Sequence, residues 1–137
     1  MKISVTDDFP ACAAIRRRVF IEEQNVPEDL ELDDLDATAV HLLATQDGRP
    51  VGTARLLIDG GTAKIGRVAL LRDARGTGAG AALMRAALDE LRARGVTTAK
   101  LGAQTHAIGF YERLGFVSYG PEYDDAGIPH RDMTLRL

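Results

Sequence analysis

The sequence predicts an α/β fold with a mixed, mostly antiparallel sheet of six or seven strands flanked by helices. Short apolar segments separated by glycine- and aspartate-containing turns run along most of the chain, which is typical of strands joined by hairpins. One segment, 81–94, contains no glycine or proline and spaces its leucines at helical intervals, so it predicts a long amphipathic helix. The length of 137 residues and a hydrophobic content of 45% suit one compact domain over residues 1–137.

The chain is expected to begin with a strand and a helix. Residues 2–6 alternate weakly between polar and apolar side chains, as a half-buried strand does. Asp7 or Asp8 can cap a helix that extends to about Glu23. The Val26-Pro27 pair ends this segment, because the residue before a proline disfavours the helical conformation.

The segment 28–37 is strongly acidic and predicts either an irregular loop or a single helical turn. Two interpretations are open: a solvated loop, or an acidic rim that attracts a cationic substrate. The carboxylates are Glu28, Asp29, Glu31, Asp33, Asp34 and Asp36.

Three strands are expected next, at 40–45, 51–58 and 64–71. Turn residues separate them, with Asp47-Gly48 after the first and Asp59-Gly60-Gly61 after the second. Such short connections predict an antiparallel meander.

The end of the chain should add a parallel strand, a helix and a final strand pair. The strand 97–101 follows the long helix, and a right-handed crossover would place it parallel to 64–71. A shorter helix is expected at 105–114, with a loop at 122–130. The last two strands are expected at 116–119 and 133–137.

Composition argues against several function classes. The net charge of −3 gives no general attraction to nucleic acid, and aromatic residues make up only 5% of the chain. The three histidines and the single cysteine, Cys12, lack the spacing of metal ligands and allow no internal disulfide, so no metal site is expected. No apolar leader or membrane-length segment is evident, so no membrane association and a cytoplasmic location are expected.

The glycine-rich segment Arg75-Gly76-Thr77-Gly78-Ala79-Gly80 lies between a predicted strand and the long helix. Glycine lets a backbone approach a ligand closely, and the first N–H groups of a helix have no internal partner. Together these features predict an anion site, most naturally for a pyrophosphate. An NTPase loop would end in Gly-Lys-Ser/Thr, whereas Ala81 follows here, and a dinucleotide fingerprint needs G-x-G-x-x-G after the first strand. A glycine-rich helix start without a ligand stays an alternative.

Two motifs resemble those of the GNAT N-acetyltransferases. Arg75-x-x-Gly78-x-Gly80, after a strand ending in Val68-Ala69-Leu70, is similar to that family's acetyl-CoA pyrophosphate motif. The segment from Ala107 to Phe116 is similar to the family's late helix and the strand after it, and the order of all elements agrees. The resemblance extends to the ElaA-like branch. That finer likeness rests on the segments 18–24, 26–27, 101–104 and 123–130.

The resemblance implies a binding path for the cofactor. In the family, the strand before the glycine loop splays from its parallel neighbour, and the pantetheine arm bonds to its backbone, here around Val68 and Leu70. Gly66 could help to open that gap, because glycine inside a strand often marks a bulge. The residues expected at the cofactor are Val68, Ala69, Leu70, Arg75, Gly76, Thr77, Gly78, Ala79, Gly80, Gln104, His106 and Phe110.

Tyr111 matches the family tyrosine near the cofactor sulfur, which implies that it assists departure of the thiolate. A phenol is protonated at neutral pH and can donate a proton. Many family members carry a glutamate on the strand before the glycine loop as the base, whereas Arg67 lies in that neighbourhood here. The candidates for the general base are Glu22, Glu23, Asp33, Asp36, His41, His106 and His130.

The expected function is acetyl-CoA-dependent N-acetylation of a primary amine of a small molecule or peptide, by direct attack on the thioester. A non-catalytic acyl-CoA-binding sensor and a protein–protein interaction module on the same fold are the alternatives. Proteins that resemble this chain are commonly dimers, so a homodimer is a further expectation.

Overall fold

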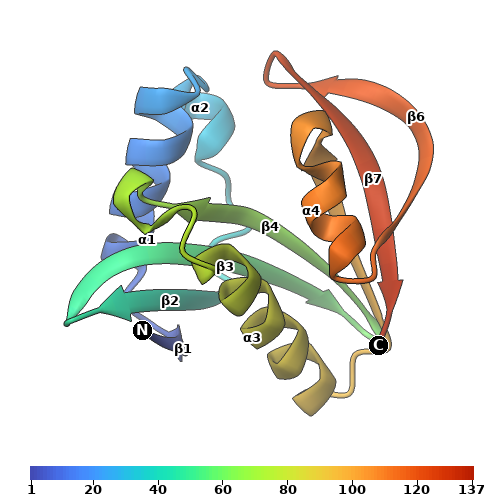
Figure 1. The fold of residues 1–137 in the computed structure, drawn as a ribbon, viewed down its shortest axis with the longest axis horizontal. Coiled ribbons are helices and arrows are strands. Elements are labelled where there is room, and N and C mark those ends of the chain that lie inside the picture. The colour runs from blue at the N-terminus through green and yellow to red at the C-terminus, as the bar shows by residue number, and fades with distance from the viewer.

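The computed structural model describes residues 1–137 and contains one seven-stranded sheet with the strand order β1-β2-β3-β4-β5-β7-β6 (Figure 1). The strands are β1 (Lys2–Thr6), β2 (Val40–Gln46), β3 (Arg49–Asp59), β4 (Thr62–Leu70), β5 (Thr98–Gln104), β6 (Val117–Asp125) and β7 (Ile128–Arg136). The helical elements are α1 (Phe9–Arg16), η1 (Arg17–Glu23), α2 (Glu28–Glu31), η2 (Arg72–Ala74), α3 (Ala79–Ala93), η3 (Thr105–Ala107) and α4 (Ile108–Arg113).

The sheet is antiparallel except at its centre, as expected. β1 to β4 form an antiparallel meander, and β4 and β5 form the only parallel pair. This pair is short: Thr62 to Lys64 lie opposite Thr98 to Lys100, and no pairing continues beyond them. Both strands run on for several residues, so they diverge. The predicted fold class and the splayed parallel pair are therefore confirmed.

A bulge in β4 accompanies this divergence. Thr53 of β3 pairs with Ala69 and Arg55 pairs with Gly66, so two β4 residues face the single residue between them. The residue with positive φ is Arg67, at 50°, and not Gly66. A left-handed conformation is costly for a residue with a side chain. The guanidinium of Arg67 donates to the Glu31 carbonyl at 2.9 Å, which holds the bulge in place.

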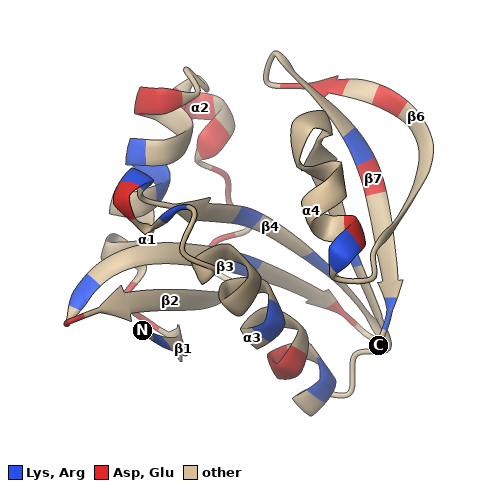
Figure 2. Ribbon diagram, viewed as in Figure 1, with Lys and Arg blue, Asp and Glu red and all other residues tan.

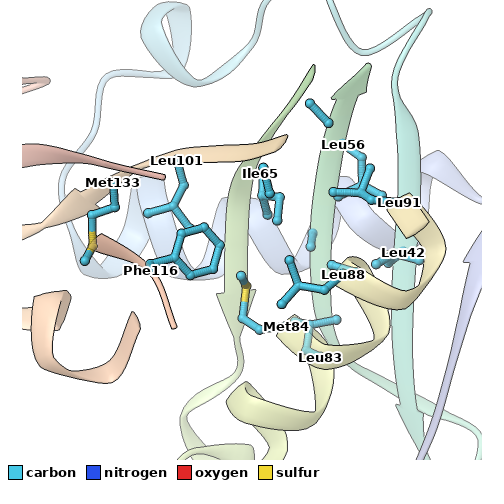
Figure 3. Close-up of a cluster of buried hydrophobic side chains, with 14 of the residues drawn as sticks. Leu42, Leu56, Ile65, Leu83, Met84, Leu88, Leu91, Leu101, Phe116 and Met133 are labelled. Atoms are coloured by element: carbon cyan, nitrogen blue, oxygen red, sulfur yellow. The ribbon is translucent and has the colours of Figure 1, made fainter. Parts of the chain in front are cut away.

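The two faces of the sheet are covered by different helices. α3 and α4 pack on one face, where α3 side chains such as Leu83 and Leu91 contact Leu56 and Leu42 of the strands (Figure 3). The next residue of β2, Leu43, points to the other face and packs with Ile15 and Val19 of α1 and η1. The sheet therefore has a hydrophobic core on each of its two faces. The divergence of β4 from β5 opens within the sheet itself.

Several predicted boundaries need correction. The helix from Asp8 begins as expected, with the Asp8 side chain accepting from the Ala11 amide, and the helical segment ends at Glu23 as expected, but beyond Arg16 it is the π-helical segment η1. The first part of the acidic segment forms the single helical turn α2, which is one of the two expected forms, and residues 32–37 belong to no helix or strand. The loop expected at 122–130 is wrong, because β6 and β7 form a hairpin that turns at Ala126 and Gly127.

Candidate functional site

A cavity of about 290 Å³ lies where β4 and β5 diverge. β4 contributes residues 64–68 to its wall, β5 contributes Leu101 and Gln104, α4 contributes Tyr111 and β7 contributes His130. The opposite wall comes from η1 and α2. The cavity thus joins residues from both halves of the chain at the centre of the sheet.

The glycine-rich turn before α3 presents a row of free amides. Gly76 and Gly78 have φ values of 74° and 83°, and Gly78 caps α3 without any side-chain hydrogen bond. The amide nitrogens from Gly76 to Ala81 donate to no acceptor in the chain. A Cβ at Gly76 or Gly78 would meet nothing within 4 Å, so the turn is not plugged by side chains. Such a helix start binds anions through its N–H groups and its dipole.

The free edge of β4 leads from this turn to the cavity. The amide of Leu71 donates to Val51 of β3 at 2.8 Å. Because backbone groups alternate along a strand, those of Leu70 and Val68 face away from β3, toward the divergence. The Leu70 carbonyl accordingly accepts from Nε of Arg75 at 3.0 Å, and Val68 lines the cavity. Ala69 is buried and faces the core formed with Ile15 and Val19.

The charge of Arg75 is shared with a carboxylate. Its guanidinium lies 2.9 Å from the carboxylate of Glu23. The hydrogen bond from Arg75, together with the charge of Arg72, lowers the pKa of Glu23 below the usual glutamate value. The cation therefore lies at the end of β4, beside the free amides, and η1 is tied to the same place. Thr77 bonds through its hydroxyl to the Ala74 carbonyl at 2.7 Å, which stabilises the turn.

Tyr111 places a phenol on the cavity wall. Its ring packs edge-to-face against Phe110 at 5.0 Å and Phe116 at 6.0 Å between ring centroids. Burial raises the pKa of Tyr111, so the phenol keeps its proton at neutral pH. Phe110 in turn lies against Gly80, where a Cβ would be 3.5 Å from its ring. Phe110 therefore packs between the start of α3 and the Tyr111 ring.

Gln104 lines the cavity, whereas His106 does not. The amide nitrogen of Gln104 donates to Gln24 at 2.9 Å, and its oxygen lies 2.7 Å from Nε2 of His106. Gln104 therefore links the end of β5 to Gln24, the residue after η1, and His106 supports it from outside the cavity wall.

Three of the six carboxylates of the acidic segment point inward and are paired with arginines, so at most the other three could form the free acidic rim of one of the two interpretations above. Figure 2 shows acidic residues gathered on α2 and the segment after it. Glu31 and Asp36 bind the buried Arg16, and Asp33 and Asp36 bind Arg55 at 2.7 and 3.1 Å. The third arginine is Arg67 at the β4 bulge, which pairs with Glu31 and Asp33. Three arginines thus neutralise the three inward carboxylates.

Most candidates for a general base are occupied or lie elsewhere. Burial acts to raise the pKa of Asp33 and Asp36, but hydrogen bonds and charge from their arginines lower it on balance. His41 is buried under Phe9, with Nε2 3.0 Å from the Asp36 carbonyl. Glu22, Glu23 and His106 lie outside the cavity wall. Of the seven candidates, only His130 lines the cavity.

Sequence reasoning missed Tyr123, which lies beside His130. The two rings stack with centroids 5.9 Å apart, and the Tyr123 hydroxyl donates to Asp132 at 2.7 Å. Burial and this bond raise the pKa of Tyr123. Gly102 leaves room for the phenol, since a Cβ there would be 2.5 Å from the hydroxyl oxygen. No signal in the sequence indicated this pairing of Tyr123 with His130, because the stretch 122–130 was expected to be a loop.

Comparison with known proteins gives a consistent result. Residues 7–137 match the family model of the acetyltransferase (GNAT) domain. The uncharacterized N-acetyltransferase YjcF of Bacillus subtilis is 36% identical over 120 residues, which cover 87% of this chain and 86% of that protein. A crystal structure of an acyl-CoA N-acyltransferase from Pseudomonas aeruginosa is 34% identical with a TM-score of 0.88, covering 97% of both chains. The crystal structure of Escherichia coli ElaA is 27% identical with a TM-score of 0.87 and the same coverage. None of the helices combines the length and hydrophobicity that a membrane span requires.

Proposed function

Because the chain belongs to the GNAT acetyltransferase family and is an N-acetyltransferase, we propose that it transfers an acetyl group from acetyl-CoA to a primary amine. The acceptor is the amine of a small molecule or peptide, and its nitrogen attacks the thioester directly. One observation carries the proposal: a row of free amides continues along an open strand edge into a cavity lined by the half-buried phenol of Tyr111.

The residues present suit a thioester that carries a diphosphate. The amides from Gly76 to Ala81 would hold the pyrophosphate, with the cation of Arg75 beside them. The outward backbone groups of Val68 and the outward amide of Leu70 would pair with the amide-bearing arm, as a strand edge pairs with an added strand, while the Leu70 carbonyl stays bonded to Arg75. Gln104, already hydrogen-bonded to Gln24 after η1, would contact the arm near its reactive end.

The proposed role of Tyr111 is to protonate the departing sulfur. When the amine displaces CoA, the sulfur leaves as a thiolate and gains from a proton donor. The burial that raises the pKa of Tyr111 keeps its proton available at neutral pH. Its packing between Phe110 and Phe116 holds the ring in one orientation, which favours proton transfer at a fixed position.

The test compares two tyrosine variants. In Tyr111→Phe, CoA release from acetyl-CoA with a panel of primary amines should fall about 100-fold in kcat, while calorimetry shows acetyl-CoA binding little changed. Tyr119→Phe is the matched control, because Tyr119 is an exposed β6 residue outside the cavity. Unchanged turnover in Tyr111→Phe would refute the acid role. Saturable binding of acetyl-CoA with no CoA release for any amine would indicate a sensor instead.

A further inference from the structure

We propose that His130 is the general base that removes the proton from the acceptor ammonium, directly or through one water. The inference rests on the proposed function and assigns a role that the sequence left open among seven residues. It depends on the hydrogen bonding of the His130 ring and on its place in the cavity. It also depends on the other candidate bases, which are bound to arginines or lie outside the cavity wall.

The backbone selects one tautomer of His130. Nδ1 lies 2.7 Å from the carbonyl oxygen of Ile128, and a carbonyl can only accept, so Nδ1 carries the proton of this bond. In the neutral ring, Nε2 then holds a lone pair. Nε2 has no partner in the chain and is not buried, so it is free to accept a proton. The ring is also held by stacking on Tyr123, which Asp132 anchors through its hydroxyl.

The sheet register brings this ring to the reactive end of the cavity. His130 lies opposite Gln104 in the β5–β7 pairing, at the end of β5. From Gln104 the chain turns through η3 into α4, which carries Tyr111. Val68, Tyr111 and His130 therefore line one cavity, so a base and an acid both border the space beside the strand edge that would hold the thioester.

The other acidic groups at this cavity are less suited to the role. Glu31 also lines it, but its carboxylate is buried and bound to Arg16. Asp125 lines the cavity from the exposed β6–β7 turn. A carboxylate is a weaker base than an imidazole, and a general base works best when its pKa is near the operating pH. Lys64 and Arg67, the basic side chains at this wall, are hydrogen-bond donors and not proton acceptors.

The proton balance closes with these two residues. Nε2 of His130 takes a proton from the ammonium, and the freed lone pair attacks the thioester carbon. The C–S bond then breaks as the amide forms, and the amide nitrogen loses a second proton. Tyr111 protonates the sulfur and regains a proton from that second loss. The imidazolium releases its proton to solvent, so one acetylation yields the amide, CoA and one proton.

The variant His130→Asn separates chemistry from structure. The asparagine amide can still donate to the Ile128 carbonyl in place of Nδ1, but it cannot accept a proton at the place of Nε2. The assay is CoA release from acetyl-CoA, with aliphatic primary amines and with hydroxylamine, corrected for the uncatalysed rate. Aliphatic amines are protonated at neutral pH, whereas hydroxylamine is largely unprotonated and needs no base to expose its lone pair.

We expect kcat/KM for the best aliphatic amine to fall about 100-fold or more in His130→Asn, with a much smaller fall for hydroxylamine. Asp125→Asn should leave that ratio between the two acceptors unchanged. In wild-type protein labelled with ¹⁵N-histidine, long-range NMR correlations should show the neutral His130 ring protonated at Nδ1.

Equal losses for both acceptors in His130→Asn, an unchanged rate, or a ring protonated at Nε2 would each overturn the assignment. If wild-type protein binds acetyl-CoA but acetylates no amine, the proposed function fails and the base fails with it. That outcome is recognised from wild-type protein alone, whereas failure of the base alone needs an active wild type and an active variant.

Discussion

Replacing Arg55 with methionine should destabilise the fold by about 3 kcal/mol, whereas replacing Arg49 on the same strand should cost less than about 1 kcal/mol. The two ion pairs have similar lengths, 2.7 Å for Arg55–Asp33 and 2.6 Å for Arg49–Asp73. They differ in burial: the Arg55 side chain is 6% exposed and that of Arg49 is 55% exposed. The comparison therefore separates the effect of burial from that of geometry.

The size of the Arg55 effect follows from the groups that the variant leaves behind. Removing one partner of a buried ion pair costs about 3–5 kcal/mol, because the other charge stays buried and unpaired. Here Asp36 keeps Arg16 at 2.8 Å and Asp33 keeps Arg67 at 3.3 Å. Nε of Arg55 already lacks a hydrogen-bond partner. Both facts point to the lower end of that range.

Urea unfolding followed by circular dichroism measures the two free energies of unfolding. At about 4 °C per kcal/mol for a chain of this length, thermal midpoints should fall by about 12 °C for Arg55→Met and by less than about 4 °C for Arg49→Met. Equal losses in the two variants, or a loss below about 1 kcal/mol for Arg55→Met, would refute the view that burial makes this network sensitive.

Two further predictions concern the glycine turn and the response to acid. Gly78→Ala and Gly48→Ala, each at positive φ with open space around it, should both lose about 1 kcal/mol of stability. Only Gly78→Ala should weaken acetyl-CoA binding in calorimetry, by about tenfold, which corresponds to a loss of about 1.4 kcal/mol of binding free energy. Equal affinities in the two variants would count against the amide site. Burial opposes the shift, but the arginines hold the folded-state pKa of Asp36 below its unfolded value of about 3.9. Its stabilising contribution is therefore present above that pH and lost as the pH falls below it, so urea midpoints of Asp36→Asn should decline less between pH 5 and 2 than those of the wild type.

Features set by short stretches of sequence were predicted well. The turn with Gly76 and Gly78 and the helix after it depend on neighbouring residues, and both formed nearly where expected. The meander of β2, β3 and β4 followed from turn residues between short apolar segments. Local chemistry of this kind does not depend on the rest of the fold.

Features that depend on distant partners were missed. The inward carboxylates could not be told from solvated ones, because the partner Arg67 lies 36 residues from Glu31 in sequence. β6 is almost fully exposed, so it lacks the alternation that identifies a half-buried strand. The remaining clue to the β6–β7 hairpin was Gly127, a residue typical of a tight turn. In the structure Ala126 and Gly127 both have positive φ, as in a two-residue hairpin. The bulge gave no clue, since arginine is an unusual residue at positive φ.

The anchoring of Arg67 has a consequence for the kinetics of ligand entry. The bulge is held by bonds to main-chain oxygens of α2, so the parting of β4 from β5 is a property of the folded chain itself. A ligand that enters there displaces water from backbone groups and does not have to separate paired strands. Association should accordingly be a single rapid step with a rate proportional to ligand concentration, without the plateau that a slow opening step would impose.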